Sequence, residues 1–368
     1  GQNGVDNGWV VFNGLHIPRD ALLDRFSSID ENGKFKSQIK KKSQRFAIQI
    51  SALTGGRLAV SISASLATFA GCSIGTRYCS VRRQFGDKTR PEYSIMEYPL
   101  VHSKIAQFNC SALVYFMVPA IILQEWKYVD VFNLHDPRVK ELHSISSYIK
   151  VASTWSSSQA LAKVRELVGG HGYSVYSFLP SLMNYTEVNI TWEGSNEILI
   201  QQTAKNLLDE FNIFKTKNKI RYQTLQFLQK FEDEQVDIDL AISKIKDFTE
   251  MLQTGELRTL IQPLSAERER LSLEDSRKLL SSLLEILPHF KTILQLRLFE
   301  MIDKCLAKFA LFFTEMSSTK GKLFHSFNKS LPDVLIPCAI FYGELVTFDI
   351  FGKLMIFIGD SYASPPFS

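Results

Sequence analysis

The chain has 368 residues, of which 45% are hydrophobic and 22% are charged. This length exceeds one typical domain, and the apolar content is enough to bury two cores without disulfides or metals. The 42 basic and 38 acidic residues leave a formal net charge of +4, which gives no electrostatic reason to expect a nucleic-acid partner. We therefore expect two domains and no nucleic-acid function.

The cysteines indicate neither a disulfide framework nor a metal centre. There are five, and they show neither the C-x-x-C spacing nor the histidine partners of a zinc site. We interpret them as free thiols in a reducing compartment. Cys72 and Cys79 are seven residues apart and so share one face of an expected helix, which favours packing over redox chemistry.

Two features bear on membranes and on the extent of the chain. The most apolar stretch, residues 339–358, is interrupted by Glu344, Asp349 and Lys353, so we expect no membrane span. The chain starts with Gly1 and shows no signal-peptide pattern. We expect it to be part of a longer protein.

The first forty residues contain the expected extended structure. Residues 8–20 combine aromatic and β-branched residues with turn residues, which predicts a strand, a turn and a second short extended piece. Residues 30–34 form a turn cluster. From about residue 40 onward the pattern is helical. Residues 44–83 lack proline and carry small residues at spacings of mostly three or four, so another helix or a ligand can approach this helix closely.

The remaining elements are expected to be helices separated by loops. Four long helices in the first part predict a helical bundle. Residues 215–221 are basic and polar and are predicted to be a linker. Pro263 and Pro288 are expected to separate the later helices. The further helices are predicted at residues 94–129, 137–167, 193–211, 222–254, 273–287 and 289–316.

Arg82 and Arg83 end the first long helix, just before Phe85 and Gly86. Guanidinium groups at a helix end suit a phosphate or a carboxylate, because they donate hydrogen bonds in a fixed fork. Taken on its own, the segment is better explained as a solvated basic helix end.

Residues 169–173 form a glycine-rich break. Gly169, Gly170 and Gly172 permit positive φ and let a flat ligand lie against bare backbone. The segment follows a helix and lacks the G-x-G-x-x-G order, so a Rossmann dinucleotide site is excluded. A simple turn between helices is the alternative. His171 is a candidate base or ligand, although such a histidine more often bonds to backbone.

Glu193 follows Trp192 close to the start of an expected helix. A carboxylate there is commonly an N-cap. The functional alternative is a general base whose pKa is raised by Trp192 and a bound apolar chain. The segment by itself leaves both interpretations open.

In this order and spacing, the three segments resemble the acyl-CoA oxidase and acyl-CoA dehydrogenase superfamily. Residues 4–8 and 17–20 are similar to the last strands of the middle β-domain in its oxidase branch. The resemblance covers residues 1–211 well and the rest loosely. It implies a mainly α fold, with a β-domain remnant at 1–36, an FAD-binding and dimerising helical bundle at 37–214, and a second helical domain at 222–368.

The resemblance also assigns roles to individual residues. It implies that Glu193 is the catalytic base, which removes the proton α to the thioester carbonyl while a hydride leaves for FAD. It implies that Arg57 and Gly194 contact the substrate, and that Arg82 meets the FAD pyrophosphate from the neighbouring subunit. The other residues implied in FAD binding are Phe85, Gly169, Gly170, Gly172, Ser195 and Glu197.

The implied activity is an acyl-CoA oxidase that makes trans-2-enoyl-CoA and passes electrons to O2, giving H2O2. The partners are fatty acyl-CoA, O2 and a second copy of the chain. Two rivals remain: a dehydrogenase that uses an electron-transfer flavoprotein, and a non-catalytic structural relative. The family implies a peroxisomal location, although residues 363–368 are not a Ser-Lys-Leu signal.

Overall fold

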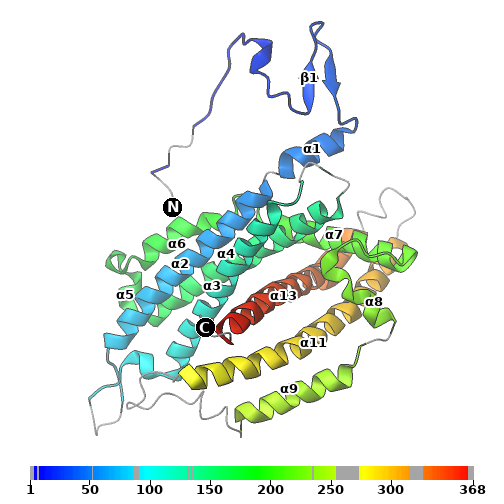
Figure 1. Cartoon of the computed structure of the whole chain (residues 1–368). Coiled ribbons are helices and arrows are strands. Elements are labelled where there is room, and N and C mark those ends of the chain that lie inside the picture. The colour runs from blue at the N-terminus through cyan, green and yellow to red at the C-terminus, as the bar shows by residue number, and fades with distance from the viewer. Residues whose placement is uncertain are drawn as a thin grey trace, which may run out of the picture. The chain divides into compact units, whose positions relative to one another are not determined.

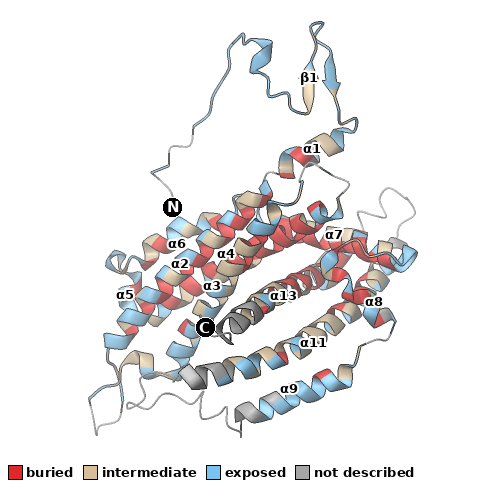
Figure 2. Ribbon diagram, in the orientation of Figure 1, coloured by how far each residue is buried: buried red, intermediate tan, exposed pale blue. Residues whose placement is uncertain are grey.

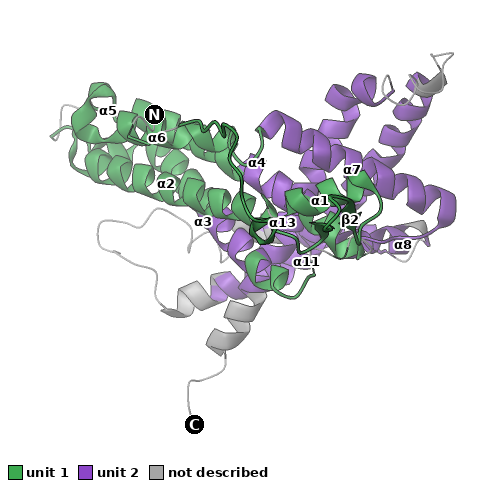
Figure 3. Cartoon of the chain, turned by 90° about the horizontal axis from the view of Figure 1, so that it is seen from above, with its two compact units in different colours: residues 1–112, 123–143, 153–195 green, residues 113–122, 144–152, 196–368 purple. Residues whose placement is uncertain are grey.

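The structure is a computed structural model that describes residues 4–5, 8–51, 53–86, 91–130, 133, 136–233, 236–253, 273–314 and 326–363. It divides into two compact units (Figure 3). Unit 1 comprises Gly1–Ala112, Leu123–His143 and Ser153–Ser195. Unit 2 comprises Leu113–Ile122, Ser144–Ala152 and Asn196–Ser368. The domain boundaries expected from the sequence remain a prediction.

The extended structure is a single hairpin in the described part of unit 1. Strands β1 (Ser27–Ile29) and β2 (Phe35–Ser37) pair antiparallel. The Asp30 carboxylate accepts hydrogen bonds from the backbone N–H groups of Asn32 and Lys34 at 3.0 and 2.9 Å, which confirms the predicted turn. The expected strands lay within residues 4–20, so the hairpin at residues 27–37 was not predicted.

The prediction of a strand within residues 8–20 is wrong. The described residues there form no strand, and the one regular element is a single turn of 3-10 helix, η1 (Arg19–Ala21). Trp9 and Phe12 are 85% and 73% exposed. A strand exists only where a neighbour pairs with its backbone, and this run has none among the described residues.

The rest of unit 1 is helical, and α3 and α4 also contribute residues to unit 2. The predicted bounds of α4 are confirmed; Asp136 caps its first turn. The short helices after residue 169 were not predicted. In chain order the elements are α1 (Lys42–Ser51), α2 (Leu53–Val81), η2 (Ile95–Glu97), α3 (Pro99–Trp126), α4 (Pro137–Leu167), α5 (Gly170–Tyr173), η3 (Val175–Ser177), α6 (Leu179–Thr186) and η4 (Glu187–Ile190).

The small residues of α2 allow α4 to approach it closely. A Cβ placed on Gly71 would lie 2.4 Å from Leu161 Cδ2, and one on Gly75 would lie 2.7 Å from Val164 Cγ1. Both partners belong to α4, which runs beside α2 in Figure 1. The prediction that a second helix packs against this face is confirmed.

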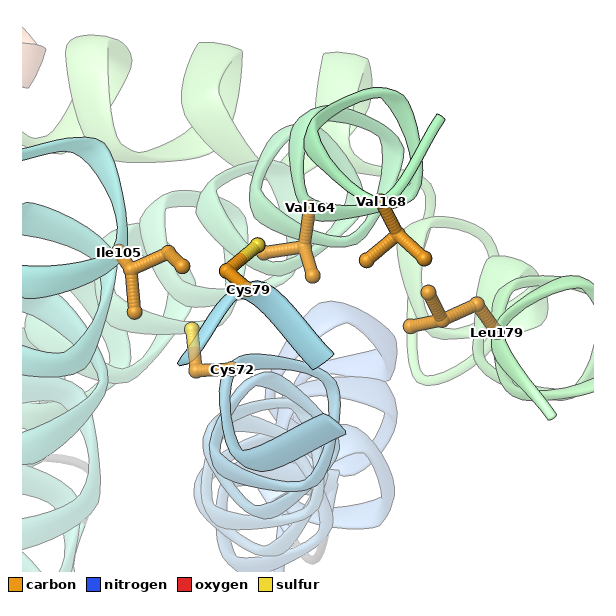
Figure 4. Close-up of a cluster of buried hydrophobic side chains, with 6 residues drawn as sticks. All are labelled: Cys72, Cys79, Ile105, Val164, Val168 and Leu179. Carbon is orange, nitrogen blue, oxygen red and sulfur yellow. The ribbon is translucent and has the colours of Figure 1, made fainter. Parts of the chain in front are cut away.

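Cys72 and Cys79 lie in a buried cluster at this helix contact (Figure 4). Both are fully buried, together with Ile105 of α3, Val164 of α4 and Leu179 of α6. Burial raises the pKa of the Cys72 thiol to about 11, because the thiolate is poorly solvated there. The predicted packing role is confirmed.

Thiol labelling is expected to separate Cys110 from Cys72. Cys110 is exposed, whereas Cys72 is buried. With a pKa near 11, Cys72 carries roughly one thiolate per thousand thiols at pH 8. We expect iodoacetamide to modify Cys110 in the native protein long before Cys72, as read by peptide mass spectrometry. Equal rates without denaturant would contradict the packing in Figure 4.

Unit 2 is also helical, with α9 and α13 both packed against α11. Figure 2 shows that α9 is mostly exposed and that α11 is mostly of intermediate burial. The elements are α7 (Asn196–Lys217), η5 (Gln223–Leu225), α8 (Phe227–Glu232), α9 (Ile238–Gln253), α11 (Leu273–Thr314), the π-helical turn η6 (Leu331–Leu335) and α13 (Ile336–Ala363).

Two boundary predictions in this unit are wrong. Pro288 lies inside α11 rather than between two helices, because buried side chains on both sides, Ile286 and Leu298, favour one continuous helix. The segment predicted as a linker is anchored, since Arg221 Nε donates to the buried Glu210 carboxylate at 2.9 Å. Pro263 lies outside the described residues.

Three helices are long and apolar enough, by length and composition alone, to cross a membrane. They span Lys42–Val81, Pro99–Trp126 and Ser326–Met355. The charges in residues 339–358 therefore do not by themselves exclude a span, because the apolar content of a helix is averaged over its whole length. Their most apolar windows are 56%, 28% and 44% buried within the protein. The absence of a membrane span remains a prediction.

Candidate active site

Glu193 lies in a short connection between η4 and α7 and has an unusual backbone. Its φ is 56°, and φ of the next residue, Gly194, is 108°. A left-handed conformation costs a residue with a Cβ about 1–2 kcal/mol, so neighbouring contacts must maintain it. Glu193 precedes Asn196, the first residue of α7, by three positions. It therefore lies outside the N-cap position, which argues against the capping interpretation.

The Glu193 carboxylate lies directly over Gly56 of α2. A Cβ on Gly56 would be 2.7 Å from Glu193 Cδ and Oε2 and 2.9 Å from Oε1. Only glycine leaves room for the carboxylate at this point. Oε2 is buried and has no hydrogen-bond partner within the described part of the chain. Buried polar atoms are nearly always paired, so this oxygen requires an explanation.

Arg57, the next residue on α2, joins Glu193 to a third element. Its side chain is 5% exposed. Nε donates to the Glu193 carbonyl oxygen at 3.2 Å, and Nη1 lies 3.0 Å from Nδ1 of His143 in α4. Burial lowers the pKa of Arg57, and the charge of Glu193 acts in the opposite direction. The structure thus places Arg57, Gly194 and Glu193 together, as the sequence predicted.

A second group of predicted residues lines one cavity of about 470 Å³ in unit 1. Arg82, Phe85, Gly169 and Gly170 all contribute to its wall. Arg82 follows the last residue of α2, and Gly169, with φ of 68°, follows the end of α4. Other lining residues are Tyr78, Gln84, Ile95, Tyr98, Leu100, Val101, Leu167, Val168 and His171.

The cavity suits a flat, negatively charged ligand. A Cβ on Gly169 or Gly170 would meet nothing within 4 Å, so the backbone there faces open space. The rings of Tyr78 and His171 are 5.5 Å apart and tilted by 50°. Arg82 supplies positive charge, and the aromatic rings supply surfaces on which a planar ring can stack.

Three predicted residues are placed elsewhere. Gly172 is buried and is not among the residues lining the cavity. It packs against α4 instead, because a Cβ on it would lie 2.1 Å from the Arg165 carbonyl oxygen. Ser195 and Glu197 are exposed and also lie outside the cavity wall. Their contacts with a cofactor remain a prediction.

Gly172→Ala is expected to destabilise the protein by about 2 kcal/mol, because its Cβ would collide with backbone that cannot move aside. Gly170→Ala is the matched control, since the added Cβ meets nothing within 4 Å. Thermal unfolding of both variants measures the difference. A Gly172→Ala protein as stable as the control would show that the loop is not packed on α4 as described.

The two groups of residues lie at opposite ends of α2. Arg57 is in its first two turns and Arg82 follows its last residue. At 1.5 Å per residue, the 25 positions between them correspond to roughly 37 Å. This exceeds the separation of the flavin ring and the pyrophosphate in one FAD molecule.

Sequence reasoning missed Gly56 and His143. Gly56 belongs to the small-residue face of α2, but its partner is 137 positions away in the chain. His143 has no neighbouring motif, and its contact with Arg57 spans 86 positions. Only the fold reveals these two residues.

Comparisons with known proteins show which proteins the chain resembles. Residues 50–208 match the family described as acyl-CoA oxidase, C-alpha1 domain. The chain is 33% identical over 212 residues to acyl-coenzyme A oxidase 2, peroxisomal, from Arabidopsis thaliana, covering 57% of this chain and 30% of that protein. It is 31% identical over 215 residues to human peroxisomal acyl-coenzyme A oxidase 3, covering 56% of this chain and 31% of the relative.

Solved structures share the fold over almost the whole chain. Acyl-CoA oxidase 3 from Yarrowia lipolytica superposes with a TM-score of 0.66 at 19% identity, covering 96% of this chain and 45% of that one. Acyl-CoA oxidase-1 from Caenorhabditis elegans, complexed with FAD and ATP, gives a TM-score of 0.63 at 18% identity, covering 93% of this chain and 43% of that one.

The chain spans about a third of the length of the curated relatives that it matches. The predicted mainly α fold is confirmed, since solved acyl-CoA oxidase structures with helical domains share this fold. The resemblance inferred from the three sequence segments is confirmed as well: residues 50–208 match the acyl-CoA oxidase C-alpha1 domain, and the chain is similar to a helical portion of acyl-CoA oxidases.

Proposed function

We propose that this chain carries the catalytic base of an FAD-dependent acyl-CoA oxidase, with Glu193 as the base. The reaction is the α,β-desaturation of a fatty acyl-CoA to a trans-2-enoyl-CoA, with O2 reduced to H2O2. The observation that carries the proposal is the buried, unpaired Oε2 of Glu193 over Gly56. An oxygen without a partner is available to accept a proton from the substrate.

The surroundings of Glu193 suit proton abstraction next to a thioester. The α-proton is weakly acidic, so the developing enolate oxygen needs a donor already in place. The backbone N–H of Glu193 donates no hydrogen bond within the described residues, so it is available for this purpose. Arg57 holds the same peptide segment through the Glu193 carbonyl oxygen, which fixes the carboxylate relative to a bound substrate.

The cavity residues are chemically suited to FAD. Arg82 and the open backbone at Gly169 and Gly170 would hold the pyrophosphate, and Phe85 would lie against a ring. Ser195 and Glu197 are proposed to contact the adenine and ribose side. When bound, FAD accepts the hydride that leaves the β-carbon of the substrate.

A homodimer follows from the length of α2. Because Arg57 and Arg82 are roughly 37 Å apart, a cofactor beside Glu193 would meet Arg82 of a second copy. The apolar window of α3 is only 28% buried within one copy, which leaves apolar surface for that second copy to cover. Because a second copy would cover this apolar surface, we propose that α3 does not span a membrane.

Mixed dimers test this arrangement directly. Glu193→Gln and Arg82→Ala homodimers are each expected to be inactive. A heterodimer has one doubly altered site and one intact site, so about half the wild-type activity per dimer should return on subunit mixing. Each variant mixed with itself is the control. No recovery in a heterodimer verified by tags would show that Glu193 and Arg82 serve the same copy.

The remaining assignments follow the relatives. Several are named peroxisomal, and we propose that location. We also propose the domain limits 1–36, 37–214 and 222–368. The relatives' names favour the oxidase over a dehydrogenase, and the unpaired Glu193 favours an enzyme over a structural relative.

The full-length product of the gene that encodes this chain provides the test. It should purify with bound flavin and produce H2O2 and trans-2-enoyl-CoA in a one-to-one ratio from a fatty acyl-CoA in air. Flavin that is bleached by substrate but reoxidised only by an electron-transfer flavoprotein would identify the dehydrogenase. A colourless protein without turnover would identify the structural relative.

A further inference from the structure

His143 is a residue that the proposed reaction does not yet use. It lies on α4, in the part of that helix assigned to unit 1 together with Arg57 and Glu193. Its Nδ1 atom is 3.0 Å from Arg57 Nη1, and Arg57 Nε in turn donates to the Glu193 carbonyl oxygen at 3.2 Å. One buried guanidinium thus joins α4 to the Glu193 connection.

The contact determines the protonation state of the His143 ring. Arginine has only N–H donors, so Nδ1 must present its lone pair to Nη1. The ring is therefore neutral, with its proton on Nε2. Burial and the charge of Arg57 lower the pKa of His143 to about 4, so this neutral form dominates at neutral pH. The facing charged groups are Arg57 itself and, beyond it, Glu193.

The backbone conformation of the Glu193 connection must be stabilised by contacts with other elements. Glu193 has a left-handed φ of 56°, and its Oε2 has no hydrogen bond within the described chain. The side-chain hydrogen bond that it receives comes from Arg57. A long arginine side chain has many rotamers, and a second contact at Nη1 selects the one in which Nε faces the Glu193 carbonyl.

We propose that His143 is a positioning residue, which orients the Arg57 guanidinium and thereby holds the strained Glu193 turn with its carboxylate over Gly56. The statement about catalysis rests on the proposed function, because it treats Glu193 as the base. The orientation of Arg57 by His143 does not depend on that function. Hydrogen exchange and NMR measure this geometry, and kinetics measures its effect on catalysis.

The matched substitutions are His143→Leu and His143→Asn. Leucine removes the acceptor, whereas the Oδ1 atom of asparagine occupies nearly the place of Nδ1 and accepts from Arg57. Thermal unfolding of both variants shows whether they are folded. His102→Leu is the control, because His102 is an exposed histidine of α3 whose Nδ1 lies 3.2 Å from the Met96 carbonyl oxygen in η2.

Hydrogen exchange of the Thr191 and Trp192 amides, which both donate to the Val188 carbonyl oxygen, reports the geometry. We expect His143→Leu to speed their exchange by about tenfold, and His143→Asn and His102→Leu to leave it unchanged. Histidine nitrogen NMR at pH 7 should show His143 with a proton on Nε2 alone, the signal being assigned by its loss in His143→Asn. Unchanged exchange in His143→Leu, or a proton on Nδ1, would overturn the proposal.

Kinetics of the full-length enzyme report the consequence. His143→Leu should lower kcat by about 10- to 100-fold with little change in KM, and His143→Asn should restore most of it. An equal loss of kcat in both variants would show that a hydrogen-bond acceptor facing Arg57 is not required, and would overturn the positioning role of His143. If Glu193→Gln retains activity, the proposed function fails, while the exchange and NMR results still decide the geometry.

Discussion

Glu193→Gln is expected to lower kcat by about 10³-fold or more in the full-length enzyme. The amide has the shape of the carboxylate and fits over Gly56, but it cannot accept the substrate proton. Flavin content and thermal stability should remain close to wild type, because Oε2 has no hydrogen-bond partner to lose within the described chain. Anaerobic bleaching of the flavin by acyl-CoA measures the chemical step.

The matched control is Glu187→Gln, six positions earlier and exposed. It removes one negative charge from the same region and should leave turnover within a factor of about two. A Glu193→Gln enzyme that bleaches its flavin at the wild-type rate would remove Glu193 from the mechanism.

Gly56→Ala is expected to damage activity without damaging the fold. The added Cβ would lie 2.7 Å from the Glu193 carboxylate, well inside van der Waals contact. Either the carboxylate or the connection must move, and a displacement of this size can cost about 100-fold in kcat. Alanine is also the better helix former by up to about 1 kcal/mol, which offsets part of the strain.

Gly55→Ala separates these two effects. It lies one position earlier in α2, and its Cβ would meet nothing within 4 Å. We expect it to keep full activity and to raise the free energy of unfolding by about 0.5–1 kcal/mol. Equal activity of the two alanine variants would show that the carboxylate does not lie over Gly56.

The helices and the resemblance to the family could be predicted from the sequence, because both depend on local residue patterns. Pro137 after Asp136 marks the start of α4, and the spacing of Cys72 and Cys79 identifies a buried face of α2. The boundaries failed where packing overrides local preference. Pro288 should end a helix by itself, yet buried neighbours keep α11 continuous.

The candidate site divides in the same way. The composition and spacing of the segments around Glu193, Arg82 and the glycines at 169–172 were enough to suggest the resemblance to acyl-CoA oxidases. The contact of the Glu193 carboxylate with Gly56, and the link through Arg57 to His143 across 86 positions, are visible only in the folded chain. These contacts join residues on different helices, and no local pattern of charge or hydrophobicity specifies which pairs the packing brings together.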